Sequence, residues 1–219
     1  MLDTYGRKYV NRFIEPTVRL FEKLNWKPTH VTCTALAIGV TAAACYGLAI
    51  PVVIPILLMW FSGYLDAVDG ALARRTGQIT AVGTLLDIFF DRVVELAFIL
   101  AFTVRYPNSV FSQLVLTCTI VLSMTVFLTS GTLLENTGVK SFRYQTGLME
   151  RTDGFIMFTF MMIFENHMNY TALIYAALIL FTAIQRLVMA ILEIRKAEKQ
   201  REGNEINKSE INKSLEKVE

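Results

Sequence analysis

The chain has 219 residues with a formal net charge of +2, and 53% of the residues are hydrophobic. Its mean hydropathy of +0.44 excludes an ordinary soluble domain of this length. The small net charge gives no reason to expect a nucleic acid as a partner. The three cysteines lie in apolar segments without metal-ligand spacing, so we expect packing residues rather than disulfides.

The first 27 residues are predicted to form an amphipathic helix on the inner face of a membrane. Apolar residues recur at spacings of three and four, at Val10, Phe13, Ile14, Val18, Phe21 and Leu24. Basic residues fall mainly between them, at Arg7, Lys8, Arg12, Arg19 and Lys23. This pattern suits the boundary between acyl chains and anionic headgroups. A soluble helix packed on protein is the alternative.

Six apolar segments follow, each about as long as the ~20 residues that a helix needs to cross a bilayer. They are predicted over residues 31–50, 52–73, 81–104, 110–134, 153–168 and 170–193. The fold class is therefore an all-α integral membrane protein, with six transmembrane helices in a domain of residues 28–195. Residues 196–219 are rich in Lys, Glu, Asn and Ser, and are predicted to form a charged, disordered tail.

The positive charges predict the orientation of these spans. The connecting segments on one side hold Arg74, Arg75, Lys140, Arg143 and Arg151, and both basic termini fall on that side. The turns on the other side hold only Arg105. Since basic residues favour the cytosolic side, we expect a multi-pass protein of the cell membrane with both termini in the cytosol.

Four aspartates lie in two pairs at the predicted cytosolic ends of the second and third spans. Asp66 and Asp69 are three residues apart, and Asp87 and Asp91 are four apart. On helices, both spacings place the two carboxylates on one face, so a hairpin would bring all four together. Ionised carboxylates near lipid are costly, and a divalent metal with oxygen ligands is their simplest partner.

Neighbouring residues suit a phosphate. Arg74 lies at the end of the hairpin, where it can meet a phosphate, and Gly70 and Gly83 let a ligand approach the backbone. Two metals can bridge a pyrophosphate and neutralise charge as a P–O bond breaks. The segment therefore predicts a metal-dependent site for phosphoryl transfer at a membrane.

This segment resembles the complete motif of the CDP-alcohol phosphotransferase family, also called CDP-alcohol phosphatidyltransferases. All eight motif positions match, as Asp66-x2-Asp69-Gly70-x2-Ala73-Arg74-x8-Gly83-x3-Asp87-x3-Asp91. The resemblance extends to the six-span layout and the N-terminal helix, about residues 1–195. It implies that an acceptor hydroxyl attacks the β-phosphorus of a CDP-alcohol, usually CDP-diacylglycerol, and that CMP leaves.

The resemblance also implies roles for single residues. Two divalent ions, Mg²⁺ or Mn²⁺, are expected on Asp66, Asp69, Asp87 and Asp91, with Asp91 as the general base. The expected CDP site comprises Thr32, Asp66, Asp69, Gly70, Ala73, Arg74 and Gly83. Thr32 closes a Pro28-Thr-His-Val-Thr32 stretch similar to a family element near the nucleotide. The alternative is that Thr29 or Thr32 caps a helix.

Four basic residues are candidates for binding a phosphorylated acceptor: Lys140, Arg143, Arg151 and Arg186. For the first two, membrane anchoring is the alternative. Glu150-Arg151 is similar to an element of the inositol-phosphate and glycerophosphate branches, but Gly154 stands where those branches have a second arginine. Glu95, one turn after Asp91, is expected either to face the same cavity or to pair with Arg92 or Arg186.

The predicted function is transfer of a phosphatidyl group from a CDP-activated lipid to an alcohol in phospholipid biosynthesis. Glycerol 3-phosphate or inositol phosphate is the predicted acceptor, and a lipid alcohol, as in cardiolipin synthesis, is an alternative. The rivals are a membrane transporter that uses the acids as a cation pathway, and an inactive lipid-binding scaffold. Arg74 argues against the cation pathway. The family resemblance suggests a homodimer.

Overall fold

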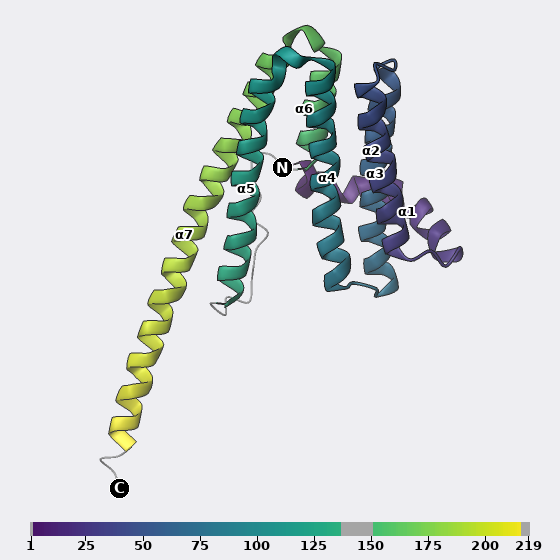
Figure 1. Cartoon of the computed structure of the whole chain (residues 1–219). Coiled ribbons are helices and arrows are strands. Elements are labelled where there is room, and N and C mark those ends of the chain that lie inside the picture. Colours follow the sequence, from purple (N-terminus) through teal and green to yellow (C-terminus); the bar gives the residue numbers. More distant parts are fainter. Residues whose placement is uncertain (1, 137–150, 216–219) are drawn as a thin grey trace. The chain divides into compact units, whose positions relative to one another are not determined.

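The computed structural model describes residues 2–136 and 151–215, with side chains placed for residues 13–133 and 152–199. Within these residues every regular element is a helix (Figure 1). In chain order they are α1 (Leu2–Lys23), α2 (Pro28–Gly47), α3 (Val53–Thr76), α4 (Ala81–Arg105), η1 (Pro107–Ser109), α5 (Val110–Asn136), α6 (Arg151–Ile163), η2 (Glu165–His167) and α7 (Met168–Leu215).

Four of the described segments are long and apolar enough to cross a membrane, namely 28–47, 53–76, 107–133 and 165–199. The other two predicted spans correspond to α4 and α6. α4 carries several charged side chains, at Asp87, Asp91, Arg92 and Glu95, and α6 has only 13 residues. The all-helical, membrane-type architecture is therefore confirmed, and the number of six spans stays a prediction.

The last helix extends far beyond its predicted end. α7 continues to Leu215, so the residues predicted as a disordered tail are helical over most of their length. Lys, Glu, Arg and Gln dominate residues 195–201, and these residue types favour helices. Extending an existing helix also avoids the cost of nucleation, which lowers the need for apolar packing.

The chain divides into two compact units. The first comprises residues 1–118 and 149–176, and the second comprises 119–148 and 177–219. The first unit holds α1 to α4, α6, and the opening parts of α5 and α7. It also holds all four aspartates, so the site lies within this unit.

Helix α2 is the centre of the first unit, because α3 and α4 both pack against it. The three helices meet at Gly39, where a Cβ atom would lie 2.7 Å from Val94 Cγ2 and 2.8 Å from Ser62 Oγ. Ser62 Oγ also donates a hydrogen bond of 2.7 Å to the carbonyl of Ala35. The absence of a side chain at Gly39 thus permits the close approach that places the two acid-bearing helices beside α2.

A short loop, residues 77–80, joins α3 to α4. Gly77 ends α3 with φ of 68°, in the left-handed region that glycine adopts without strain. Thr80 begins α4, and its Oγ1 accepts a hydrogen bond of 3.0 Å from the backbone N–H of Gly83. Both helix ends are therefore fixed by local chemistry, and we call this side of the unit the loop end.

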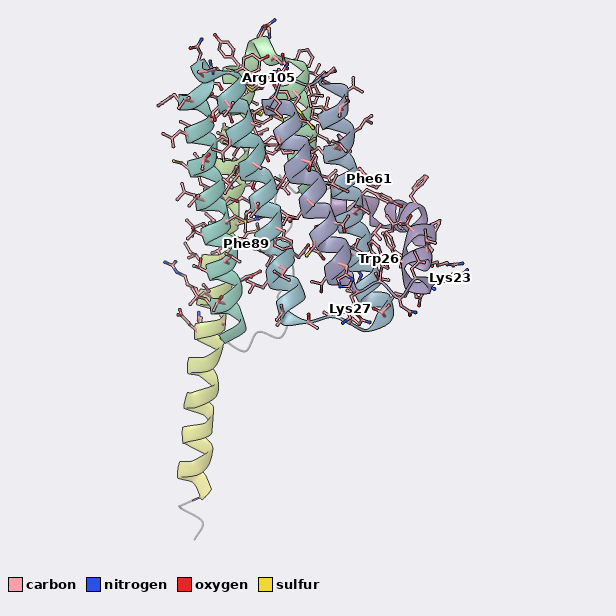
Figure 2. The ribbon with its side chains drawn as sticks, turned by 45° about the vertical axis from the view of Figure 1, so that its right-hand side comes forward. Lys23, Trp26, Lys27, Phe61, Phe89 and Arg105 are labelled. Atoms are coloured by element: carbon pink, nitrogen blue, oxygen red, sulfur yellow. The ribbon has the colours of Figure 1, made fainter. Side chains whose placement is uncertain are left out.

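The opposite side, which we call the far end, is closed by a polar cluster that we call the far-end clamp: Tyr46, Arg105, Tyr106 and Glu165. Arg105 Nη2 lies 3.0 Å from Glu165 Oε1 and Arg105 Nη1 donates to the Tyr46 carbonyl at 3.1 Å. Both tyrosine hydroxyls donate to Glu165. Figure 2 shows Arg105 at this end, while Lys23 and Lys27 lie toward the loop end.

Candidate metal and nucleotide site

Three of the four predicted acids converge between α3 and α4. One carboxylate oxygen from each of Asp66, Asp69 and Asp87 lies within 4.8 Å of the other two. Asp69 is buried, with 5% of its surface exposed, and the other two are half-buried. The loop at 77–80 turns the chain back, so that Asp87 of α4 meets Asp66 and Asp69 of α3.

This group of acids fits a divalent cation. Oxygens that share one Mg²⁺ lie about 2.1 Å from it, and hence at most about 4.2 Å apart. Small side-chain rotations therefore allow the three carboxylates to share an ion. Three like charges, one of them buried, repel one another strongly unless a cation neutralises them. The donor set, oxygen only, is the one that Mg²⁺ and Mn²⁺ prefer.

Asp91, the fourth predicted acid, lies outside this group but close to it. Together with Asp66 it lines a shallow, open hollow. All three central helices supply the other lining residues, which are Thr32, Ala35, Leu36, Ser62, Phe90 and Val94. Asp91 is half-buried and borders open space, which is the position required of a base that must reach a substrate hydroxyl.

Thr32 faces the same hollow as Asp66 and Asp91. Its hydroxyl donates a hydrogen bond of 3.0 Å to the carbonyl of Pro28, one turn earlier in α2. The N-cap of α2 is Lys27, with Pro28 in the first turn, so neither Thr29 nor Thr32 caps the helix. The interpretation of Thr32 as a helix cap is therefore wrong. The position of Thr32 beside the acids suits the interpretation that it belongs to the nucleotide site.

Arg74 folds back along α3 toward the acids. A Cβ atom on Gly70 would lie 3.4 Å from Arg74 Nη1, so the guanidinium covers the glycine that follows Asp69. Gly83 lies at the start of α4, where a Cβ atom would meet Thr80 Oγ1 at 3.1 Å. Ala73, on the last turns of α3, is half-buried. The motif residues thus border the acid group from the loop end.

Glu95 pairs with Arg92 on the same helix, as one of the predicted alternatives held. Arg92 directly follows Asp91, and Glu95 lies one turn beyond Asp91 on α4. The Arg92 side chain is 32% exposed and that of Glu95 is 14% exposed. Glu95 is therefore one half of an ion pair next to the site.

The predicted acceptor residues are placed less completely. Lys140 and Arg143 lie outside the described residues, and Arg151 begins α6 with its side chain outside them. Arg186 belongs to the second unit, where its guanidinium carbon lies 5.6 Å from the centre of the Phe127 ring. A cation that lies on the face of an aromatic ring is stabilised by that ring. The contact between Arg186 and Phe127 does not by itself identify a ligand that Arg186 binds.

Two features of the structure were not predicted. Ser62 lines the hollow one helical turn before Asp66, a position that the i, i+4 rule would have suggested. The hydroxyl of Tyr175 lies 2.8 Å from where a Cβ atom of Gly154 would be. Tyr175 therefore occupies the space next to the backbone at position 154, and a larger residue there requires the ring to move.

Comparisons with known proteins agree with the motif. Residues 26–192 match the family model described as CDP-alcohol phosphatidyltransferase. Inner membrane protein YnjF of Escherichia coli is 30% identical over 213 residues, which cover 91% of this chain and 100% of that protein. Archaetidylinositol phosphate synthase of Aeropyrum pernix is 35% identical over 89 residues, 41% of this chain. The match spans only 46% of that synthase.

The fold is also similar to solved structures. A crystal structure of Mycobacterium tuberculosis phosphatidylinositol phosphate synthase with CDP-DAG bound superposes with a TM-score of 0.63 and 21% identity, covering 82% of this chain and 94% of that one. The same synthase with manganese and citrate gives a TM-score of 0.67 and 20% identity, covering 81% and 88%. At these identities the likeness shows a shared fold.

Proposed function

The chain belongs to the CDP-alcohol phosphatidyltransferase family, and from this premise we propose that it transfers a phosphatidyl group from a CDP-activated lipid to an alcohol, releasing CMP. The observation that carries the proposal is the group of Asp66, Asp69 and Asp87 beside an open hollow. Acids that converge on a cation, next to space for a substrate, suit the chemistry of a diphosphate.

We assign the divalent ions to the three converging acids, with Asp91 as a further ligand of the second ion. Bound ions would neutralise the diphosphate and the charge that develops on the departing CMP. Mg²⁺ and Mn²⁺ both suit carboxylate oxygens, and manganese occurs in the structure of the mycobacterial synthase. Arg74 adds a fixed positive charge at the loop end, where it can hold a phosphate of CDP.

The chain's own residues supply the proton transfer. Asp91 accepts the proton of the acceptor hydroxyl, because its carboxylate borders the hollow rather than the three-acid group. Thr32 and Ser62 offer hydroxyl groups in the same hollow. The apolar side chains of Leu36, Phe90 and Val94 limit the entry of water, which would otherwise compete as a nucleophile.

We propose a phosphorylated polyol as the acceptor and place inositol phosphate first, ahead of glycerol 3-phosphate. The support comes from the names of similar proteins, which are synthases of archaetidylinositol phosphate and phosphatidylinositol phosphate. We assign its phosphate to Arg151 and Arg186, which adjoin or lie within apolar stretches of the sequence, with Lys140 and Arg143 as further candidates. A lipid alcohol is the alternative acceptor.

We also propose that α1 lies on the cytosolic membrane surface, with both termini and the acids on that side. Phe13 and Leu20 of α1, with Leu24 just after its end, form one exposed apolar stripe, with exposed fractions of 77%, 54% and 56%. Ile14 and Val18, on a different face, are buried against α2 and α3. The exposed stripe suits insertion between headgroups. A homodimer in the membrane completes the proposal.

The experiment is a transfer assay with the purified full chain. CDP-diacylglycerol and Mn²⁺ or Mg²⁺ are mixed with inositol phosphate, glycerol 3-phosphate, free inositol or phosphatidylglycerol, and CMP release is measured for each. The expected result is CMP release that depends on a phosphorylated polyol and stops in EDTA. Substitution of Arg151 or Arg186 by Gln should raise the KM of that acceptor and leave the KM of CDP-diacylglycerol unchanged.

Two outcomes contradict the proposal. Preference for an unphosphorylated acceptor refutes the acceptor assignment and leaves the reaction class intact. Absence of CMP release with every acceptor, together with metal-dependent cation flux through proteoliposomes, favours the transporter instead.

A further inference from the structure

One arginine at the loop end binds two carboxylates of another helix. Arg75 Nη1 lies 2.5 Å from Glu15 Oε1, and Arg75 Nε lies 2.6 Å from Glu22 Oε2. Both acids belong to α1, two turns apart, and Arg75 belongs to the last turn of α3. Arg19 also pairs with Glu15, at 2.9 Å, but remains within α1.

Apolar packing holds the same two helices together. Ile14 and Val18 of α1 are buried in a cluster with Val68 and Leu72 of α3. The Thr17 hydroxyl lies 2.6 Å from the hydroxyl of Tyr64, one turn before Val68 in α3. The ion pairs therefore lie at the outer edge of an interface whose apolar side already fixes the two helices. Because the helices are fixed, forming the pairs costs less side-chain entropy than it usually does.

The segment of α3 that α1 supports is the one that carries Arg74. Helix ends lack backbone partners for their last carbonyl groups and fray readily. Here the last turn must hold Arg74 over Gly70 and must start the 77–80 loop that returns Asp87 to the acid group. A frayed end would move both of these features at once.

Arg75 itself is a poor candidate for binding a phosphate. Its guanidinium already faces two carboxylates, and the pairing with Arg19 and Arg75 holds the pKa of Glu15 below its ordinary value. With Arg19 included, the cluster of Arg75, Glu15 and Glu22 carries two positive and two negative formal charges. An anionic ligand gains little from such a cluster.

We propose that Arg75 is a positioning residue: by binding Glu15 and Glu22 it braces the end of α3 so that Arg74 is held for the phosphates of the CDP-activated lipid. The inference rests on the proposed function, because it names how one substrate of that reaction is held. α1 thereby contributes to nucleotide binding without touching the nucleotide.

The test compares Arg75→Gln with the double variant Glu15→Gln/Glu22→Gln in the full chain. Both should raise the KM of CDP-diacylglycerol about fivefold or more, and leave kcat and the acceptor KM within about twofold. Arg75→Lys should restore part of the loss, since an ammonium lacks the fork that meets two carboxylates. Arg19→Gln is the matched control, since it removes a pair of Glu15 within α1, and should keep wild-type KM.

Calorimetric titration of CDP in the presence of Mn²⁺ gives a readout that needs no turnover. The Kd of CDP should rise in the Arg75→Gln and double Glu→Gln variants in parallel with KM, and should stay at the wild-type value in Arg19→Gln. If the wild-type chain binds CDP but transfers nothing, the proposed reaction fails, and the brace is still tested by these affinities.

Two results overturn the brace. In the first, Arg75→Gln weakens CDP binding while the double Glu→Gln variant does not, which makes Arg75 a direct ligand. In the second, both variants lower the melting temperature and keep normal KM and Kd, which makes the ion pairs merely structural.

Discussion

Asp69 differs from the other converging acids in its burial. It is 5% exposed, whereas Asp66 and Asp87 are half-buried. A carboxylate that is removed from water and placed beside two others requires a compensating positive charge. Loss of a bound cation would therefore destabilise the ionised form of Asp69 more than that of Asp66 or Asp87.

Substitution of Asp69 by Asn should reduce CMP release at least about a hundredfold, which corresponds to ~3 kcal/mol of barrier. The amide keeps the size of the side chain and removes the charge that holds the cation. Mn²⁺ binding, measured by electron paramagnetic resonance, should weaken in the same variant. Glu198→Gln, at an exposed carboxylate of α7, is the control. Unchanged Mn²⁺ binding in Asp69→Asn would refute the metal assignment.

Asp91 should behave differently from the acids of the converging group. As the base, its replacement by Asn should abolish turnover and leave the Kd of CDP within about threefold of wild type. Asp66→Asn should impair both quantities. Kd values and single-turnover rates for the two variants separate the roles, and an equal loss of CDP affinity in both would make Asp91 chiefly a ligand.

At the scale of elements, the close approach at Gly39 determines how α3 and α4 sit on α2. Gly39→Ala should force the helices apart, because the new methyl group would lie 2.7 Å from Val94 Cγ2 and 2.8 Å from Ser62 Oγ. Overpacking of this kind costs about 1–3 kcal/mol. We expect a lower melting temperature together with at least tenfold weaker activity, since the hollow lies between the same three helices.

Gly47→Ala is the matched control for this substitution. A Cβ atom there would lie 3.6 Å from Ala101 Cβ, which is ordinary van der Waals contact between α2 and α4. Its melting temperature and activity should remain near wild type. Equal sensitivity at both glycines would show that the contact at Gly39 has no special role.

The sequence predicted most helices and the convergence of three of the four acids, because both depend on local spacing. The i, i+3 and i, i+4 intervals place each acid pair on one face whatever surrounds the helix. Gly77 and Thr80 mark the loop by their own backbone preferences. The extension of α7 was missed, because low apolarity was taken to mean disorder, although its Lys and Glu residues favour helices.

The lining of the hollow was predicted only in part. Thr32 was assigned from family resemblance, and Ser62, Phe90 and Val94 were not singled out. Their role depends on how α3 and α4 sit around α2, which follows from Gly39 and not from any repeating pattern. For the same reason, no pattern in the sequence indicates that Tyr175 occupies the space beside Gly154.

At the scale of the whole molecule, the far-end clamp and the acid group lie at opposite ends of the first unit. The clamp joins α2, α4 and η2 through Glu165, which pairs with Arg105 and both tyrosines. Burial raises the pKa of Tyr106, so this phenol stays neutral and continues to donate its hydrogen bond to Glu165.

Glu165→Gln should destabilise the protein without changing its chemistry. Removing one charge of a half-buried pair leaves Arg105 poorly compensated, at a cost of about 2–3 kcal/mol. For a chain of this size the melting temperature should fall by roughly 5–10 °C. The KM values and kcat, measured well below that temperature, should stay within about twofold. A large change in KM would contradict a purely structural clamp.

The orientation of the two ends can be measured directly. Single cysteines at Gln78 and Asn108, in a cysteine-free background, report the loop end and the far end. A membrane-impermeant maleimide should label position 108 from outside intact cells, and position 78 only after the membrane is opened. External labelling of position 78 would place the acids on the wrong side of the membrane for the proposed reaction.

The construction of the hollow has a consequence for how the protein is made. It depends on Gly39, the 77–80 loop and the acid group. Every residue around the hollow comes from α2, α3 and α4, three consecutive helices that end at Arg105. Contacts of short sequence separation form quickly and need no late-arriving segment. The metal and nucleotide part of the site can therefore assemble while the second half of the chain is still being synthesised, before the helices that carry the proposed acceptor arginines enter the membrane.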